Sequence, residues 1–195
     1  MKSHARVVVI GGGVVGVSTL YHLAKKGWSD VVLVERKELT SGSTWHAAGL
    51  LPLFNMSYSV GQIHKYSVKF YQELQEETGM DVGFRNVSNI RLASNQDRMD
   101  EFRQYAGVAS TIGVQVDFLT PEQVLDYWPM ANIDGLVGAI RHPEDGYIQP
   151  ADLTQALARG ARDRGAEIYR NTAVTAITRS DDGLWIVSTD KGDIT

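Results

Sequence analysis

The stretch that decides the fold lies near the N-terminus and reads Val7-Val8-Val9-Ile10-Gly11-Gly12-Gly13-Val14-Val15-Gly16. Its first four residues are all β-branched, which predicts a strand buried on both faces, as in a parallel sheet. The glycines that follow contain the pattern G-x-G-x-x-G. Residues 17–26 then show apolar residues at helical spacing, and Gly27 is a good helix stop. A second buried strand, Val31–Val34, leads directly into Glu35.

This order of elements is typical of a dinucleotide-binding region. Gly11 permits the tight turn, Gly13 lets the backbone approach a pyrophosphate, and Gly16 lets the helix pack on the strand. The helix N-terminus at residues 14–15 offers unpaired N–H groups and a positive dipole end to the phosphates. Because the strand, the helix and the acid also occur in the right order, we prefer this interpretation to a glycine-rich turn of another α/β protein.

Glu35 lies at the end of the second strand, at the offset of roughly 20 residues where an acid accepts hydrogen bonds from ribose hydroxyls. An acid at this position favours an unphosphorylated ribose, and therefore NAD or FAD over NADP. Arg36 follows it, and contact with the adenine and full solvation are equally compatible with the sequence.

The segment after the second strand favours FAD over NAD. It reads Ser41-Gly42-Ser43-Thr44-Trp45-His46-Ala47-Ala48-Gly49-Leu50. Hydroxyl and backbone N–H groups at this density suit a second phosphate contact and a flat ring that passes close to the chain. A surface loop with incidental serines is the alternative interpretation.

Composition excludes several other classes. The chain has 195 residues, 43% of them hydrophobic and 22% charged, and a formal net charge of −4. That balance predicts a globular protein and lacks the basic footprint of a general nucleic-acid binder. The absence of cysteine excludes disulfides, zinc thiolates and thiol nucleophiles. No apolar run approaches the ~20 residues of a membrane span. Since residues 1–6 leave no room for a signal or transit peptide, we expect a cytoplasmic protein.

The segment Ser41–Leu50 closely resembles the matching segment of the dimethylglycine dehydrogenase and sarcosine dehydrogenase family, which are flavoproteins of the D-amino-acid-oxidase type. Similar stretches occur at residues 71–79, 88–93, 145–150 and 153–162, so the resemblance covers essentially the whole chain. It implies that His46 carries FAD through a covalent bond to the flavin 8α-methyl carbon. It also implies a backbone contact from Val174 to the adenine, although an ordinary strand valine fits the local pattern equally well.

Taken together, these patterns and the resemblance predict one set of cofactor-binding residues: Gly11, Gly13, Val14, Val15, Gly16, Glu35, Arg36, Ser43, Thr44, His46, Ala47, Gly49, Leu50 and Val174.

The chemistry at His46 is reasonable in its own right. A neutral imidazole nitrogen is a competent nucleophile near neutral pH, and the small residues at 47–49 would let a flat ring approach. The other histidines, at positions 4, 22, 64 and 142, are spaced unlike any metal motif, so we predict no metal site. No catalytic residue is assigned.

The patterns in the rest of the chain, together with the resemblance, predict an α/β fold. In it, a Rossmann-like FAD-binding region is interrupted by a partial substrate domain with an antiparallel sheet. The expected divisions are 1–80 for the first FAD-binding part, 81–145 for the insertion and 146–195 for the second FAD-binding part. Helices are expected at 58–78, from Asn95 to about Gly113, from Thr120 onward and at 151–164. Strands are expected at 114–118, 136–140, 166–169, 171–177 and 184–189, and a strand or hairpin at 82–93.

The resemblance implies FAD-dependent oxidation of an N-methylated amino acid of the dimethylglycine or sarcosine type, by hydride transfer from the N-methyl carbon to the flavin. The partner is then a small amine, with no nucleic acid and no membrane. The electron acceptor is not identified. There are two alternatives. One is a related amine or amino-acid oxidase that binds FAD non-covalently, and the other is a non-catalytic regulatory homologue. We expect the chain to be an N-terminal portion whose relatives continue with substrate-binding residues and a folate-associated region, so the isolated fragment should be inactive.

Overall fold

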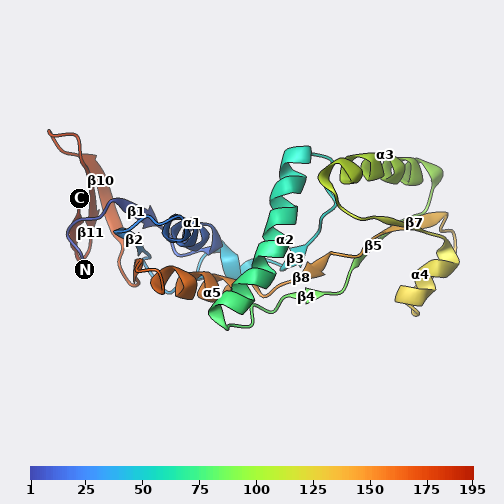
Figure 1. Ribbon diagram of the computed structural model, residues 1–195, viewed down its shortest axis with the longest axis horizontal. Coiled ribbons are helices and arrows are strands. Elements are labelled where there is room, and N and C mark those ends of the chain that lie inside the picture. Colours follow the sequence, from blue (N-terminus) through green and yellow to red (C-terminus); the bar gives the residue numbers. More distant parts are fainter. The chain divides into compact units, whose positions relative to one another are not determined.

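The computed structural model describes residues 1–195, which form two compact units (Figure 1). The first unit comprises residues 1–48, 73–83 and 149–195, and the second comprises residues 49–72 and 84–148. Residues 49–72, which the sequence placed with the first FAD-binding part, therefore belong to the second unit. None of the helices is both long and apolar enough to cross a bilayer.

The first unit is built on a parallel sheet in the order β1-β2-β9. Its strands are β1 (Val7–Ile10), β2 (Val31–Val34) and β9 (Glu167–Tyr169), and β2 is buried along its whole length. Helices α1 (Val14–Lys25) and α5 (Pro150–Arg162) pack against each other beside this sheet, as the blue and orange ribbons show (Figure 1). The predicted strands and helices of this region are confirmed to within a few residues.

Two side chains bind residues 73–83 to the rest of this unit through Glu77. The Tyr21 hydroxyl, fully buried on α1, donates to the Glu77 carboxylate at 2.8 Å. Arg164 donates to the same carboxylate at 2.7 Å. A Cβ atom on Gly160 would lie 2.7 Å from the Tyr21 ring, so the glycine is what lets α5 come this close to α1.

A second sheet of the first unit is an antiparallel meander of β10 (Val174–Arg179), β11 (Trp185–Thr189) and β12 (Gly192–Ile194). Gly183, at φ 86°, occupies the turn between the first two strands. At the end of β12, Thr195 donates its N–H to the Ser3 carbonyl at 3.0 Å and accepts from the Ala5 N–H at 2.8 Å. That is the hydrogen-bond pattern of parallel strands, placed directly before β1.

The second unit is built on an antiparallel sheet in the order β5-β7-β6, with strands β5 (Asn89–Ala93), β7 (Gly138–His142) and β6 (Asp117–Leu119). Helix α3 (Gln96–Ile112) covers one face through Met99, Phe102 and Tyr105 (Figure 1). Helix α4 (Pro121–Tyr127) packs on the other face through Val124. This antiparallel sheet is the kind of insertion that the sequence predicts.

A smaller sheet of the second unit has the order β3-β8-β4, from β3 (Leu50–Leu51), β8 (Gly146–Tyr147) and β4 (Arg85–Asn86). Helix α2 (Tyr58–Thr78) starts and ends at the residues that the sequence predicts. Its residues 58–72 belong to the second unit and its last turns belong to the first.

Of the two alternatives predicted for residues 82–93, strand structure is confirmed and a hairpin is wrong. β4 pairs with β8, and β5 pairs with β7, so the two strands never pair with each other. Ser88 between them has a positive φ of 62°, and its N–H donates to the Asp145 carbonyl at 2.8 Å. The chain is therefore turned from one sheet to the next by a contact 57 residues away in the sequence, which local patterns cannot report.

Other boundaries shift by a few residues. The strand expected at 114–118 is β6 at Asp117–Leu119, and the strand expected at 136–140 is β7 at Gly138–His142. The strand expected from residue 171 begins at Val174. Each starts later than predicted. For the first two, apolar residues in the preceding loops (Val114, Val116, Leu136 and Val137) extend the sequence pattern beyond the paired region.

We expect Gly16→Ala to lower the free energy of unfolding by about 1–3 kcal/mol, because overpacking forces the backbone to shift. The new Cβ would lie 2.0 Å from the Gly11 carbonyl oxygen. Urea unfolding followed by circular dichroism measures the change. Gly107→Ala is the matched control, since this glycine lies inside α3 with no atom within 4 Å of the new Cβ. The control should be neutral or stabilising, by up to about 1 kcal/mol. Equal effects of the two substitutions would contradict the close packing at Gly16.

Candidate functional site

The glycine loop at the carboxyl end of β1 is held by the end of β2. Gly11, at φ 110°, donates its N–H to the Val34 carbonyl at 2.9 Å. Gly12 donates its N–H to the Glu35 carboxylate at 2.7 Å, and Lys37 donates its N–H to the other carboxylate oxygen at 2.8 Å. Each carboxylate oxygen has a further lone pair that can accept another hydrogen bond, so Glu35 is oriented by the backbone and can still bind hydroxyl groups.

The N-terminus of α1 faces a hydroxyl group from a distant segment. Gly13 is the N-cap residue and has no side chain to cap the helix. Instead, the Val14 N–H donates to Thr44 Oγ1 at 2.9 Å, and Thr44 is buried. The first turn holds no acidic residue, so its positive dipole end is not neutralised by the helix itself. This arrangement suits an anionic group such as a phosphate.

The segment that carries Thr44 is tied back over the glycine loop. Thr40 has a φ of 70°, which is unusual for a β-branched residue, and its N–H donates to the Gly12 carbonyl at 3.0 Å. A Cβ at Gly12 would lie 2.6 Å from the Leu39 side chain. Residue 12 must therefore be small for this segment to lie where it does. Strain of this kind is commonly found at functional sites.

A concave surface that encloses a volume of about 200 Å³ lies beside Glu35. Two of its walls come from the ends of β1 and β2, and the third comes from the loop that leads into β10; the lining residues are Ile10, Gly11, Val34, Glu35, Arg36, Thr172, Ala173 and Val174. The Thr172 N–H donates to the Glu35 carbonyl at 2.8 Å, and this bond fixes the third wall. Glu35, Arg36 and Val174, which the sequence places at the adenosine end of a dinucleotide, are thus brought together.

His46 ends the short 3₁₀ helix η1 (Ser43–His46) and is exposed. Its Nδ1 lies 3.2 Å from the Gly42 carbonyl oxygen, and the Trp45 ring centroid lies 3.8 Å from its own. If Nδ1 donates to this carbonyl, the neutral ring has its lone pair on Nε2. The imidazole is therefore held in one orientation with one nitrogen free to react.

Most of the predicted cofactor residues lie in the first unit, along β1, α1, β2, η1 and the start of β10. Gly49 and Leu50 lie in the second unit, where Gly49 accepts the Ile148 N–H at 2.8 Å and Leu50 opens β3. Sequence reasoning missed Thr172 and Ala173. Thr172 is held at the site by its hydrogen bond to Glu35, more than 130 residues away, and Ala173 follows it; no local signal marks either residue.

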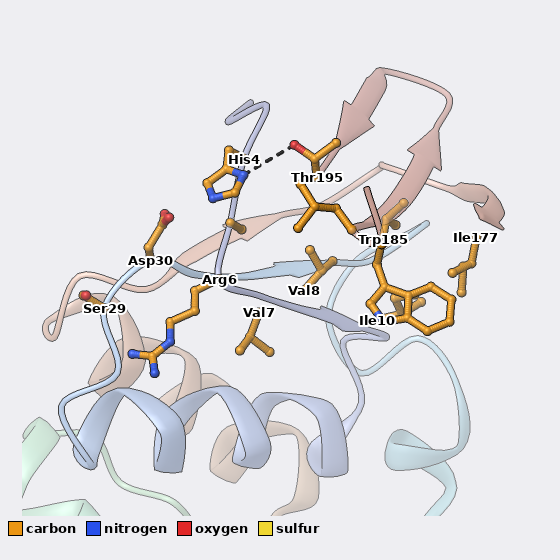
Figure 2. A pocket seen from close by; sticks show the side chains of 14 residues that line it. His4, Arg6, Val7, Val8, Ile10, Ser29, Asp30, Ile177, Trp185 and Thr195 are labelled. Atoms are coloured by element: carbon orange, nitrogen blue, oxygen red, sulfur yellow. Dashed lines mark hydrogen bonds between the residues drawn. The ribbon is translucent and has the colours of Figure 1, made fainter. Parts of the chain in front are cut away.

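A larger groove of about 800 Å³ lies along the edge of β1 that has no neighbouring strand. Figure 2 shows Val8 and Ile10 of β1 on one side of it and Ile177 and Trp185 of the meander on the other. Trp185 is 62% exposed here. The groove contains none of the predicted cofactor residues, so its size alone does not make it the functional site.

Comparison with known proteins agrees with this geometry. The model of the family "FAD dependent oxidoreductase" (DAO) matches residues 6–195. The chain is 43% identical to dimethylglycine dehydrogenase of Rattus norvegicus over 193 residues, which are 99% of this chain and 22% of the relative. It is 41% identical to sarcosine dehydrogenase of Homo sapiens over 178 residues, which are 91% of this chain and 19% of the relative. The chain thus spans about a fifth of the length of these curated relatives.

Among solved structures, L-proline dehydrogenase from P. horikoshii superposes with a TM-score of 0.93 at 27% identity. The match covers all of this chain and 51% of that one. The fold of the 195 residues is therefore that of a portion of larger flavin-dependent amine and amino-acid dehydrogenases.

We expect Thr44→Val to lower the free energy of unfolding by about 0.5–2 kcal/mol, the usual cost of losing a helix cap, because the Val14 N–H loses its acceptor. Thr44→Ser keeps the hydroxyl and should retain most of the stability. Urea unfolding of the three proteins measures the difference. A valine variant as stable as wild type would show that the hydroxyl contributes nothing to the helix N-terminus.

Proposed function

The chain belongs to the DAO family of FAD dependent oxidoreductases, and on this basis we propose that it is the FAD-binding portion of an enzyme that oxidises an N-methylated amino acid. The observation that carries the proposal is the Glu35 carboxylate, oriented by two backbone N–H groups beside the concave surface at residues 172–174. Dimethylglycine and sarcosine are the substrates we favour, because the relatives named for them match nearly the whole chain.

The residues present fit FAD. Glu35 and Arg36 would hold the adenosine end, with Val174 against the adenine. The N–H groups at residues 13–15 and the hydroxyls at 43–44 would hold the pyrophosphate. When bound, the flavin supplies the electron sink for amine oxidation, and the protein supplies orientation and electrostatics. Ala47, Gly49 and Leu50 are small or apolar and would let a flat ring lie against the chain.

We further propose that His46 binds the flavin covalently through Nε2. The support is geometric: Nδ1 lies against the Gly42 carbonyl, so Nε2 is the nitrogen with a free lone pair. The rival function, a regulatory homologue without turnover, has no chemical use for such a tether. A folate-associated region in the longer polypeptide and a cytoplasmic location stay predictions.

We expect Glu35→Ala to weaken the binding of adenosine diphosphate ribose by about 1–3 kcal/mol, because ribose hydroxyls lose a charged acceptor. Isothermal titration calorimetry gives the two affinities. Glu38→Ala is a matched control, because Glu38 is the next acid along the chain but pairs with Arg170 and Asn171. Equal affinities of wild type and the Glu35 variant would count against the assignment of the adenosine site.

If His46 carries the flavin, the denatured full-length polypeptide that contains this chain should keep its yellow colour. A tryptic peptide with His46 should then show the added flavin mass. His46→Ala should release all flavin on denaturation, while His64→Ala, on α2 and bonded to the Pro52 carbonyl, should not. Wild-type protein that loses all its flavin in acid would rule out the covalent bond and leave the non-covalent alternative.

The isolated 195-residue chain should retain flavin weakly and should not oxidise dimethylglycine or sarcosine. Its β1 edge and the exposed Ile177 and Trp185 leave an open apolar groove, so the unit should also tend to associate.

The full-length polypeptide should instead reduce its flavin with one of these amines under anaerobic conditions. Stopped-flow absorbance at the flavin band follows both proteins. Bleaching of the isolated chain by sarcosine would show that the substrate site lies within these residues, and no reduction of the full-length protein by either amine would favour the regulatory homologue.

A further inference from the structure

The second unit contains a group of buried and half-buried polar side chains that the cofactor site does not use. Asn89 of β5 and His142 of β7 are partners across the two strands, so both side chains lie on one face of the sheet. Arg91 lies two residues further along β5 on the same face, opposite Ile140. This is the face that α3 covers. Asp145 follows three residues after the end of β7.

Within this group, five buried side-chain atoms have no hydrogen-bond partner in the protein: Asn89 Oδ1, Arg91 Nε, both ring nitrogens of His142, and Asp145 Oδ2. His142 is fully buried and Asp145 is 1% exposed. Buried polar groups are almost always hydrogen-bonded, because leaving one unpaired costs the full free energy of its desolvation. Several unpaired atoms on one face of a sheet therefore point to a bound partner that is not protein.

The hydrogen-bonding character of these atoms defines that partner. The pKa of His142 is lowered to about 4, mainly by burial and to a smaller extent by the positive charge of Arg91. The ring is therefore neutral at pH 7 and offers one donor and one acceptor. Arg91 Nε is a donor, whereas Asn89 Oδ1 and Asp145 Oδ2 are acceptors. The group thus presents both donors and acceptors, which only a partner of mixed hydrogen-bonding capacity can satisfy.

The electrostatics exclude charged ligands. The Arg91 guanidinium lies 4.3 Å from the Phe54 ring centroid and disfavours a metal cation, and no cluster of three metal-binding side chains exists in the structure. Burial raises the pKa of Asp145 to about 6, so this group is largely a carboxylate at pH 7 and disfavours an anion. A small neutral molecule that both donates and accepts remains, and water is the one that buried polar sites of proteins normally hold.

We propose that this face of the second unit is a binding site for internal water, which bridges His142 to Asn89 and Arg91 to Asp145. Other hydrogen bonds of the group show a structural role for the site, which is to hold the backbone of Leu53. The Leu53 N–H donates to Asp145 Oδ1 at 2.8 Å, and the Tyr105 hydroxyl donates to the Leu53 carbonyl at 3.1 Å. Both polar groups of one buried residue are thus held by side chains far away in the sequence. Water at Oδ2 completes the hydrogen bonds of the carboxylate that holds Leu53.

A high-resolution crystal structure of the full-length polypeptide tests the site directly. Ordered water should lie within hydrogen-bonding distance of both His142 and Asn89, and between Arg91 and Asp145. A structure in which Arg91 Nε bonds directly to Asp145, or in which no water contacts His142, would overturn the proposal. This result does not depend on the flavin or on amine oxidation, so the proposed function can fail while the water site stands.

Water magnetic relaxation dispersion gives a second test in solution. His142→Phe keeps a flat ring but removes both nitrogens, and it should reduce the dispersion amplitude by at least one long-lived water. Asn89→Ala, at a half-buried position, should reduce the amplitude as well. It keeps the test available if the histidine variant does not fold. Ile140→Val is the matched control, because Ile140 lies on the same face with no polar group. Amplitudes equal to wild type in both polar variants would overturn the proposal.

Discussion

The close approach of α1 to the glycine loop is the constraint on which the first unit depends. Without a Cβ at residue 16, the helix can begin directly beside the Gly11 carbonyl, and its N-terminus then lies at the carboxyl end of β1. Because of this approach, the Val14 N–H meets Thr44 and the Gly12 N–H meets Glu35. A helix displaced by one side chain would separate the positive helix end from the acid that marks the ribose side. The proposed cofactor site therefore follows from one contact between two glycines.

Local signals predicted the elements that form through contacts within a few residues. The Asn95 side chain caps α3 by accepting the Arg98 N–H, and Thr120 and Gln123 form the capping box that the sequence indicates for α4. Local patterns also predicted β1 and β2 from their runs of β-branched and apolar residues, α1 from the helical spacing of its apolar residues, and Glu35 from its place at a strand end. In contrast, the short helix η1 was not predicted. Strands β3 and β8 were not predicted either, since each has only two residues and forms by pairing with a distant segment. Thr172 joins the site for the same reason, and no pattern near residue 172 could have shown it.

Two histidines illustrate how environment separates chemical roles. His46 is exposed on a short helix, held by one carbonyl and one indole, and keeps a free nitrogen. His142 is fully buried between α3 and its sheet, and this burial, with a smaller contribution from the Arg91 guanidinium, lowers its pKa and keeps the ring neutral. The sequence assigned a role to the first only through its neighbours at 43–49, and it gave the second no distinguishing mark. Exposure suits His46 to reaction with a large ligand, whereas burial suits His142 to structural hydrogen bonding.

The parallel pairing of Thr195 with the residues before β1 has a consequence for the order in which the two units can form during synthesis. His4 and Thr195 are 191 positions apart, yet they are neighbours at the edge of the first unit. That unit also takes β9 and α5 from residues after 149, so its parallel sheet stays incomplete until residues 167–169 have left the ribosome. The second unit is contained within residues 49–148 and has all its strands earlier. Chains fold as they emerge, and long-range pairings form last. Residues 49–148 should therefore be able to fold while β2, already paired with β1, still lacks its second neighbour β9.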